Sequence, residues 1–300
     1  MTDEIALDTK TGRKLFLDHP DTAGGGGLTF VLNLHGGGSA GVWQRGYFPA
    51  KDHVNSHRLV VASPTAATSE PFRYWTRTAD DDHLRNVVEL VFERFGAANI
   101  DAFWLVGHSQ GGMTSNRLLA TEWFADRVDG WLSLSGGRIG RADLASNFGP
   151  PPLPGHAPFR PDAATLARMG AAATPDADFS FIFATGEHEI ASLPATSPWA
   201  EKYGAGPRER RDDVVDVQAG QVHDTLREGR SNAGWGLAPR PGTAEVYVYP
   251  NGAEGRVIAD VVRLDKGHTE GLEPRITETL VSMMVAAPGG KAQRLMSSGS

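Results

Sequence analysis

The sequence predicts a single α/β domain in which helices flank a mostly parallel central sheet. Short runs that are apolar at nearly every position, such as 28–34, 103–106 and 179–185, are typical of strands buried on both faces of a sheet. Between the first two runs lies the segment 80–95, whose apolar side chains recur at helical spacing. A chain of 300 residues, 40% of them hydrophobic, can form one such domain with a large core.

The N-terminal half alternates short apolar runs with turn signals. Residues 4–7 and 14–17 flank a polar turn, which predicts a β-hairpin. The three aspartates at 80–82 fall in the first turn of the predicted helix, where carboxylates complement the helix dipole, and Gly96 ends that helix. The other elements predicted in this half are a strand at 28–34, a short helix at 49–57, a strand at 59–62 and a strand at 103–106.

Two long stretches rich in proline and glycine, 141–178 and 191–243, interrupt the C-terminal half. We interpret both as lid or cap insertions over the active-site end of the sheet. Helical spacing predicts helices at 166–173 and 212–230 within them, and the polar tail 286–300 is expected to be frayed. The other elements predicted in this half are a strand beginning at Trp131, a strand at 179–185, a hairpin formed by 245–249 and 256–264, and a helix beginning at Pro274.

Composition excludes several classes of function. The formal net charge of −7 argues against nucleic acid or an anionic membrane as a partner. Because the chain contains no cysteine, disulfides, thiolate catalysis and cysteine-bound metals are excluded. The N-terminus lacks an apolar signal region and no apolar run approaches membrane-spanning length, so we expect a cytoplasmic protein. No motif implies a metal or an organic cofactor.

The strongest functional signal is the run Gly107-His108-Ser109-Gln110-Gly111. It follows an apolar strand and precedes a segment with helical spacing, which is the arrangement of a strand–turn–helix elbow that presents a nucleophilic serine. The two glycines allow the sharp turn, and the N-terminus of the following helix favours negative charge near the serine. We therefore predict Ser109 as a nucleophile. The alternative is a glycine-rich turn whose serine only caps a helix.

A second glycine-rich loop, His35-Gly36-Gly37-Gly38, directly follows the strand predicted at 28–34. This pattern is typical of an oxyanion loop, in which backbone N–H groups point at a developing negative charge. We predict one donor from Gly37 or Gly38, and the other from the amide of Gln110, just after the nucleophile. The alternative is a flexible loop.

A nucleophilic serine needs a histidine that takes its proton, and the histidine needs an acid that fixes its tautomer. In an elbow-type enzyme the chain order is serine, acid, histidine. His268 lies in a Gly-His-Thr loop beyond the last predicted strands, whereas the other histidines precede the serine, neighbour it, or fall in or beside the insertions. We predict His268 as the base.

The acid should lie in the turn after the strand at 179–185, which contains two glutamates. Glu189 is the first choice and Glu187 the second. An acid displaced to Asp143, after the preceding strand, or to Asp265, near the base, remains an alternative.

Three tryptophans are candidates for substrate contact. Trp75 belongs to an aromatic, loop-like segment that either packs in the core or lines the pocket beside the oxyanion loop. Trp199 and Trp235 lie in the second insertion, among polar, glycine- and proline-rich residues, and could contribute to an aromatic lid.

These motifs occur in a set order along the chain: His35-Gly36-Gly37, Trp75, Asp81-Asp82, Ile100-Asp101, Gly107-His108-Ser109-Gln110-Gly111-Gly112-Met113 and Gly267-His268-Thr269. In that order the chain resembles the esterase and polyhydroxybutyrate-depolymerase-like branch of the α/β-hydrolases, which includes feruloyl and acetylxylan esterases. The resemblance implies an α/β-hydrolase fold and a Ser-acid-His hydrolase that cleaves carboxylic esters through an acyl-enzyme. It implies Ser109 as nucleophile, His268 as base and the acid at Glu189, where that branch usually has aspartate.

The sequence departs from that branch in its glutamate acid, its lack of cysteines and of a secretion signal, and its two long insertions. These departures argue against a polymeric or plant-wall substrate and favour a small, apolar ester or lactone as the substrate. A thioesterase or a peptidase of the same fold is one alternative, and a non-catalytic binding protein on a hydrolase scaffold is another. The aromatic insertions could also pack against a second subunit, so a homo-oligomer is an open expectation.

Overall fold

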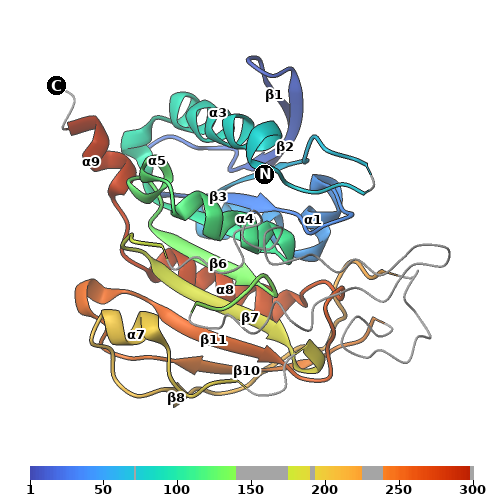
Figure 1. Ribbon diagram of the computed structural model, residues 1–300, viewed down its shortest axis with the longest axis vertical. Helices are drawn as coiled ribbons and strands as arrows, with labels where there is room; N and C mark the ends of the chain where they lie inside the picture. The colour runs from blue at the N-terminus through green and yellow to red at the C-terminus, as the bar shows by residue number, and fades with distance from the viewer. Residues whose placement is uncertain (71, 140–174, 190–192, 225–238, 298–300) are drawn as a thin grey trace.

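The computed structural model describes residues 1–70, 72–139, 175–189, 193–224 and 239–297. The helix predicted at 166–173, most of the insertion at 141–178, Trp235 and Asp143 lie outside these residues. Within the described ranges, one mixed sheet of 11 strands runs through the molecule, and helices cover both of its faces (Figure 1).

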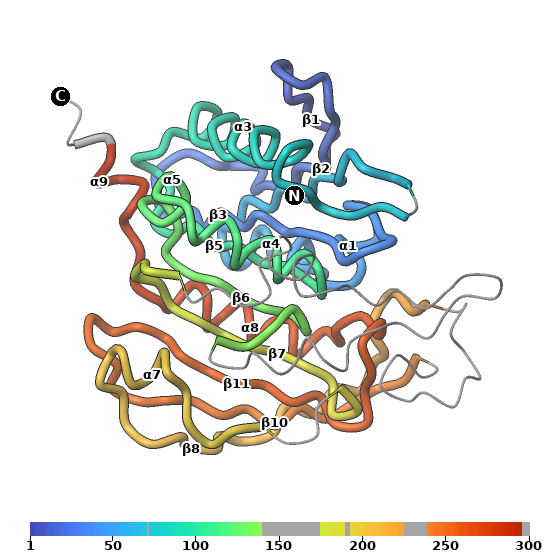
Figure 2. Tube along the Cα trace, in the orientation of Figure 1, coloured from blue at the N-terminus to red at the C-terminus, as the bar shows by residue number. Residues whose placement is uncertain are grey.

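The sheet has a parallel centre and antiparallel edges. Its order is β1-β2-β4-β3-β5-β6-β7-β11-β10-β8, and β9 also pairs with β10. Neighbouring strands from β4 to β11 are parallel, whereas the pairs β1–β2, β2–β4 and β10–β11 are antiparallel. Figure 2 shows the N-terminal hairpin and the orange β10–β11 hairpin at opposite edges. The strands are β1 (Thr2–Asp8), β2 (Arg13–His19), β3 (Leu28–Leu34), β4 (Leu59–Pro64), β5 (Ile100–His108), β6 (Gly130–Leu134), β7 (Ser180–Gly186), β8 (Glu209–Arg210), β9 (Val214–Val215), β10 (Thr243–Val248) and β11 (Ile258–Arg263).

The central strands are apolar at most positions because they are buried on both sides. Along β5, Phe103 and Leu105 belong to the core on one face, and Trp104 and Val106 belong to the core on the other. The alternation follows from the two-residue period of a strand. It explains why these strands appear in the sequence as continuous apolar runs.

Helices divide between the two faces. The core that contains Phe103 includes apolar side chains of α3, α4, α5, α7 and α9. The other core includes side chains of α1, α2 and α8. The helices are α1 (Gly41–Tyr47), α2 (Val54–His57), α3 (Arg77–Phe95), α4 (Gln110–Leu119), α5 (Glu122–Ala125), α7 (Pro198–Lys202), α8 (Pro274–Ala286) and α9 (Lys291–Ser297).

Most predicted elements are confirmed, with shifts of a few residues at their ends. The helix predicted from residue 80 begins at Arg77, because the Thr76 side chain accepts a hydrogen bond from the Ala79 amide and caps it. It ends at Gly96, as predicted. Both hairpins, the short helical segment after Pro49, and the helix beginning at Pro274 are present.

The helix predicted at 212–230 is wrong over its described part. Val214 and Val215 form β9, which pairs with β10, and no helix occurs between residues 216 and 224. Val214 and Val215, two of the residues that suggested a helical face, belong instead to a sheet edge. A short apolar run is ambiguous between strand and helix when its partners are distant in the sequence.

The second insertion is therefore only in part a candidate lid. Its described residues between 198 and 215 form α7 and the edge strands β8 and β9, which extend the sheet. Further along, the Val222 carbonyl accepts a hydrogen bond from the Gly271 amide, so this stretch reaches the loop that carries His268.

The prediction of a frayed tail is also wrong for residues 291–297. They form α9, and Ala292 is buried in the core. The Gly290 amide donates to the Asp101 carbonyl, and the Lys291 amide donates to the Asp129 carboxylate. Polar composition concealed this helix because its hydrogen-bond partners, Asp101 and Asp129, lie far away in the sequence. Among the described residues, no helix is long and apolar enough to cross a membrane.

Candidate active site

Four loops meet at the carboxyl ends of the parallel strands. The register pairs Leu34 of β3 with Gly107 of β5, His108 of β5 with Leu134 of β6, and Leu134 with Ala184 of β7. The residues that follow these strands therefore emerge at the same edge of the sheet. In open α/β sheets this edge is where ligands bind.

The elbow has the strained geometry predicted for a nucleophile. Ser109 has φ 52° and ψ −118°, a backbone conformation that residues other than glycine rarely adopt. The first residue of α4 follows it directly. A Cβ on Gly107 would lie 2.3 Å from the Gly111 carbonyl carbon, so glycine is required there. Ser109 is partly exposed, whereas His108 and Gln110 on either side of it are buried.

His268 and Glu189 form a buried pair. The His268 Nδ1 and the Glu189 Oε2 lie 2.5 Å apart, and both side chains are almost fully excluded from solvent. The other carboxylate oxygen, Oε1, accepts the Ser135 hydroxyl at 2.7 Å and the Gly186 amide at 2.9 Å. A carboxylate only accepts hydrogen bonds, so Nδ1 of His268 carries a proton, and in the neutral ring Nε2 presents the lone pair.

The other candidate acids have different partners. Glu187 is exposed, and its carboxylate accepts the Asp265 amide at 2.7 Å. The Asp265 carboxylate binds His188 Nε2 at 2.9 Å and pairs with Arg240. The geometry therefore favours Glu189 over Glu187 and Asp265 as the partner of His268.

The loop that follows β3 distinguishes between the two candidate oxyanion glycines. The Gly38 amide donates to the Arg73 carbonyl at 2.6 Å, so it is not available to an oxyanion, and this alternative is wrong. A Cβ on Gly37 would lie 3.9 Å from the Gln110 Cβ, which places Gly37 beside the first residue of α4. Amides at the start of a helix have no partner within the helix, so the Gln110 amide suits the same role.

Trp75 lies behind this loop, and its prediction as a substrate contact is wrong. Its side chain is 2% exposed, and the indole Nε1 donates to the His35 carbonyl at 2.8 Å. The Gln110 side chain binds the Trp75 backbone twice, accepting from its amide and donating to its carbonyl. Trp75 thus ties the oxyanion loop to the elbow, and the packing alternative is the one the structure supports.

His35 is a structural histidine of the same loop. Its Nδ1 donates to the Gly36 carbonyl at 2.7 Å, and its Nε2 accepts the Ala66 amide at 3.0 Å. Burial lowers the pKa of His35 to about 4, so the ring is neutral at physiological pH. The neutral ring supplies one donor and one acceptor, which this position requires.

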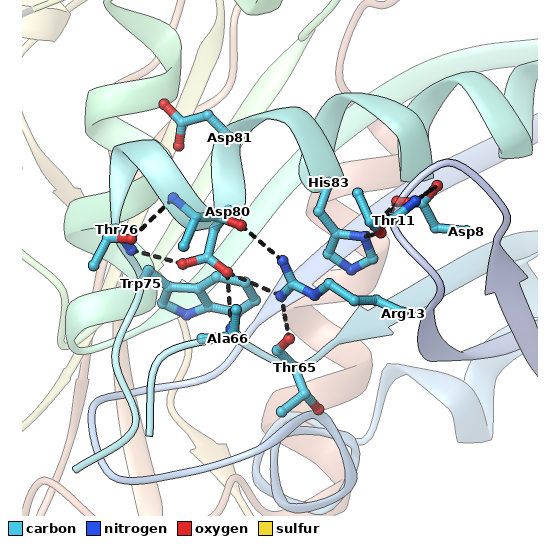
Figure 3. Close-up of polar contacts among 12 residues, drawn as sticks. Asp8, Thr11, Arg13, Thr65, Ala66, Trp75, Thr76, Asp80, Asp81 and His83 are labelled. Atoms are coloured by element: carbon cyan, nitrogen blue, oxygen red, sulfur yellow. Dashed lines mark hydrogen bonds and ion pairs between the residues drawn. The ribbon is translucent and has the colours of Figure 1, made fainter. Parts of the chain in front are cut away.

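The aspartates at the start of α3 hold neighbouring segments in place, as Figure 3 shows for Asp80. The fully buried Asp80 carboxylate accepts the Thr76 amide at 2.7 Å, the Ala67 amide at 2.9 Å and the Arg13 guanidinium at 2.9 Å. The Asp81 carboxylate forms a buried ion pair with Arg117 of α4. These contacts agree with a capping and tethering role.

Trp199 lies at the opposite end of the sheet, so its prediction as a substrate contact is also wrong. Its Nε1 donates to the Phe179 carbonyl at 2.8 Å, and its ring stacks on the Phe179 ring at a centroid distance of 4.3 Å. Phe179 precedes β7, whereas Glu189 follows the carboxyl end of that strand.

Two residues near the pair were not predicted from the sequence. Ser135 has φ 53° and follows β6, and it donates to Glu189. The Tyr47 hydroxyl, from α1, donates to the main-chain carbonyl of His268 at 3.2 Å. A polar residue directly after a buried parallel strand was the available signal for Ser135. Tyr47 lies in a stretch that carries no motif.

Among the described residues, no group of three or more potential metal ligands occurs.

Among solved structures, the chain is similar to the acetyl xylan esterase from Aspergillus awamori. The TM-score is 0.52 at 14% sequence identity, over 94% of this chain and 100% of that chain. A soluble variant of monoglyceride lipase from Saccharomyces cerevisiae matches with a TM-score of 0.42 and 15% identity, over 67% of this chain and 82% of that one. A thermophilic carboxylesterase cloned from a metagenomic library matches with a TM-score of 0.44 and 14% identity, over 62% and 68%.

No protein-family model matches the chain, and no curated protein matches its sequence. The likeness to the acetyl xylan esterase, which spans nearly the whole chain, confirms the predicted fold.

Proposed function

Because this chain has the α/β-hydrolase fold, we propose that it is a serine hydrolase that cleaves carboxylic esters or lactones through an acyl-enzyme. The observation that carries the proposal is the buried His268–Glu189 pair, with 2.5 Å between Nδ1 and Oε2, at the same sheet edge as the strained Ser109 elbow. A histidine held by a carboxylate next to an elbow serine is the arrangement that activates a hydroxyl nucleophile.

In the proposed reaction, Nε2 of His268 takes the proton from the Ser109 hydroxyl as the oxygen attacks the carbonyl carbon. The amides of Gly37 and Gln110 donate to the oxygen that becomes negative. The protonated His268, stabilised by Glu189, then donates its proton to the leaving alcohol. A water molecule, deprotonated by His268, attacks the acyl carbon on Ser109. The bond to the Ser109 oxygen then breaks, His268 returns the proton to that oxygen, and the acid is released.

The residues beside the oxyanion loop favour an apolar substrate. A Cβ on Gly37 would lie 3.4 Å from the Phe72 ring, so an aromatic side chain neighbours the proposed oxyanion site. Trp43, on α1, is partly exposed and lies with its ring centroid 5.6 Å from that of His108. Apolar walls with a few polar groups are typical of sites for small organic molecules.

The test is hydrolysis of p-nitrophenyl esters of increasing acyl length and of a γ-lactone by the intact protein and by Ser109→Ala. We expect turnover by the intact protein and a loss of at least about 10³-fold in Ser109→Ala, with unchanged thermal unfolding. A Ser109→Ala variant with wild-type turnover, or an intact protein that cleaves none of these substrates, contradicts the proposal.

A further inference from the structure

The main-chain carbonyl of His268 accepts two side-chain hydrogen bonds. One comes from His108 Nε2 at 2.8 Å, and the other from the Tyr47 hydroxyl at 3.2 Å. The two donors come from different elements, since His108 ends β5 and Tyr47 ends α1. A carbonyl held by two donors has both of its lone pairs occupied and little freedom to turn.

The three rings are packed together. The centroids of Tyr47 and His108 lie 3.9 Å apart, and those of His108 and His268 lie 4.7 Å apart. Tyr47 is 1% exposed and His108 is 3% exposed, so water does not compete for either bond. Hydrogen bonds excluded from water hold their partners more firmly than exposed ones.

The protonation state of His108 suits this role. Because a carbonyl only accepts, Nε2 of His108 carries the proton and Nδ1 is a lone pair, which has no partner among the described residues. Burial holds the pKa of His108 well below its usual value, so the ring stays neutral and does not add a charge beside the base. A Cβ on Gly36 would lie 2.7 Å from this Nδ1, so glycine leaves room for the ring.

Burial also raises the pKa of the Tyr47 hydroxyl, which keeps its proton for the bond to His268. Ser135, the donor to Glu189, lies beside the same hydroxyl. The carbonyl of the base and the carboxylate of the acid are thus held by neighbouring groups.

Other contacts anchor the far end of the base loop. The Arg263 guanidinium donates to the carbonyls of Glu270 and Gly271, both at 2.8 Å, and the Glu270 carboxylate accepts the Gly267 amide. These bonds fix the overall path of the loop. The bonds from His108 and Tyr47 instead act on the peptide unit of His268 itself.

We propose that His108 and Tyr47 are positioning residues that hold the His268 main-chain carbonyl and so set the base relative to the nucleophile. His108 is adjacent to Ser109 in the chain, so its bond ties the nucleophile elbow directly to the base loop. This inference rests on the proposed function, because it assigns these residues a part in aligning the same serine and histidine. A misplacement of about 1 Å at a reacting centre costs on the order of 10²-fold in rate.

The first test compares His108→Leu, which removes the donor, with His108→Gln, whose amide N–H can reach the position of Nε2. We expect His108→Leu to lose about 10²-fold in kcat with KM changed by less than about 3-fold, and His108→Gln to recover most of that loss. Tyr47→Phe, which removes only the hydroxyl, should lose about 10-fold in kcat. Because both donors hold one carbonyl, the effects of His108→Leu and Tyr47→Phe should not be additive.

A second measurement does not depend on turnover. The proton between His268 Nδ1 and Glu189 should give a low-field proton NMR signal that is present in the intact protein and absent in Glu189→Gln. We expect the signal to be broadened or lost in His108→Leu and in Tyr47→Phe, and retained in His108→Gln.

Equal losses of kcat in His108→Leu and His108→Gln, or an unchanged low-field signal in both His108→Leu and Tyr47→Phe, overturn the inference. If the intact protein cleaves no ester, the proposed function fails, and the NMR comparison still decides whether these residues hold the base.

Discussion

The two ends of the parallel strands use buried polar groups in different ways. At the carboxyl end, Ser109 and Ser135 both have positive φ, and the Glu189 carboxylate is held by groups from separate loops. At the amino end, Asp129 accepts hydrogen bonds from the Phe103 amide and the Lys291 amide. There, the buried carboxylate joins β5 to the start of α9 through main-chain amides.

This contrast teaches that burial of a charged group is not by itself a sign of chemistry. Strained backbone is concentrated at functional sites, where the surrounding structure over-determines it. We therefore expect substitutions at the carboxyl end to change turnover more than stability, and substitutions at the amino end to change stability alone. The following predictions test that division.

The largest effect is expected for Glu189→Gln. An amide in place of the carboxylate no longer fixes the His268 tautomer, so kcat should fall by about 10³–10⁴-fold. Glu187→Gln is the matched control, since it makes the same chemical change two residues away, on a side chain bound to the Asp265 amide. It should keep kcat within about 3-fold. The measurement uses the ester that the intact protein cleaves fastest. Comparable losses of kcat in the two variants would mean that Glu189 is not the acid.

A large effect on stability alone is expected at Asp129. Burial raises its pKa from 3.8 to about 6, so the native state binds a proton there more tightly than the unfolded chain does. The Asp129 contribution to the free energy of unfolding should therefore be most favourable below about pH 4 and fall by about 3 kcal/mol as the pH rises through 6.

Urea unfolding of the intact protein and of Asp129→Asn between pH 4 and 7 measures this contribution as the difference between the two pH curves. The difference in the free energy of unfolding should vary with pH in that window and be constant above it. At each pH the two proteins should have the same kcat. Two parallel curves would show that Asp129 titrates normally.

The smallest effect distinguishes two matched tryptophans. Trp75 and Trp199 are each 2% exposed, and each donates its indole N–H to a main-chain carbonyl at 2.8 Å. Replacement by phenylalanine should cost each variant about 1–3 kcal/mol in the free energy of unfolding, because a buried carbonyl loses its donor. Only Trp75→Phe should also lower kcat, by about 10-fold, because it releases the oxyanion loop. A similar fall in kcat for Trp199→Phe would contradict the division between the two ends.

The sequence predicts the parts of this molecule that depend on local patterns. Continuous apolar runs identified β3, β5 and β7 because strands buried on both faces need no polar side chains. The elbow at Ser109 was predictable because its backbone geometry requires small residues at fixed positions around it. The position of Glu189 in the turn after the strand favours it as the acid, and its contact with His268 supports that prediction.

The errors arise where distant segments decide the structure. Val214 and Val215 form a strand only because β10, far along the chain, offers an edge. α9 is held by hydrogen bonds to Asp101 and Asp129, which no local pattern reveals. The glycine pattern alone does not separate Gly37 from Gly38, because the Arg73 carbonyl that accepts the Gly38 amide lies in another loop. The sequence does not exclude Trp75 and Trp199 from the substrate site, because an aromatic residue in a loop-like segment does not show which way its side chain faces.

The most direct test of the central claim is covalent labelling with a fluorophosphonate, followed by peptide mapping. If Ser109 is the nucleophile activated by His268, one adduct should form, it should map to the peptide that contains Ser109, and labelling should be abolished in Ser109→Ala and strongly slowed in His268→Ala. An adduct on a different serine, or equal labelling of the intact protein and Ser109→Ala, would contradict the account.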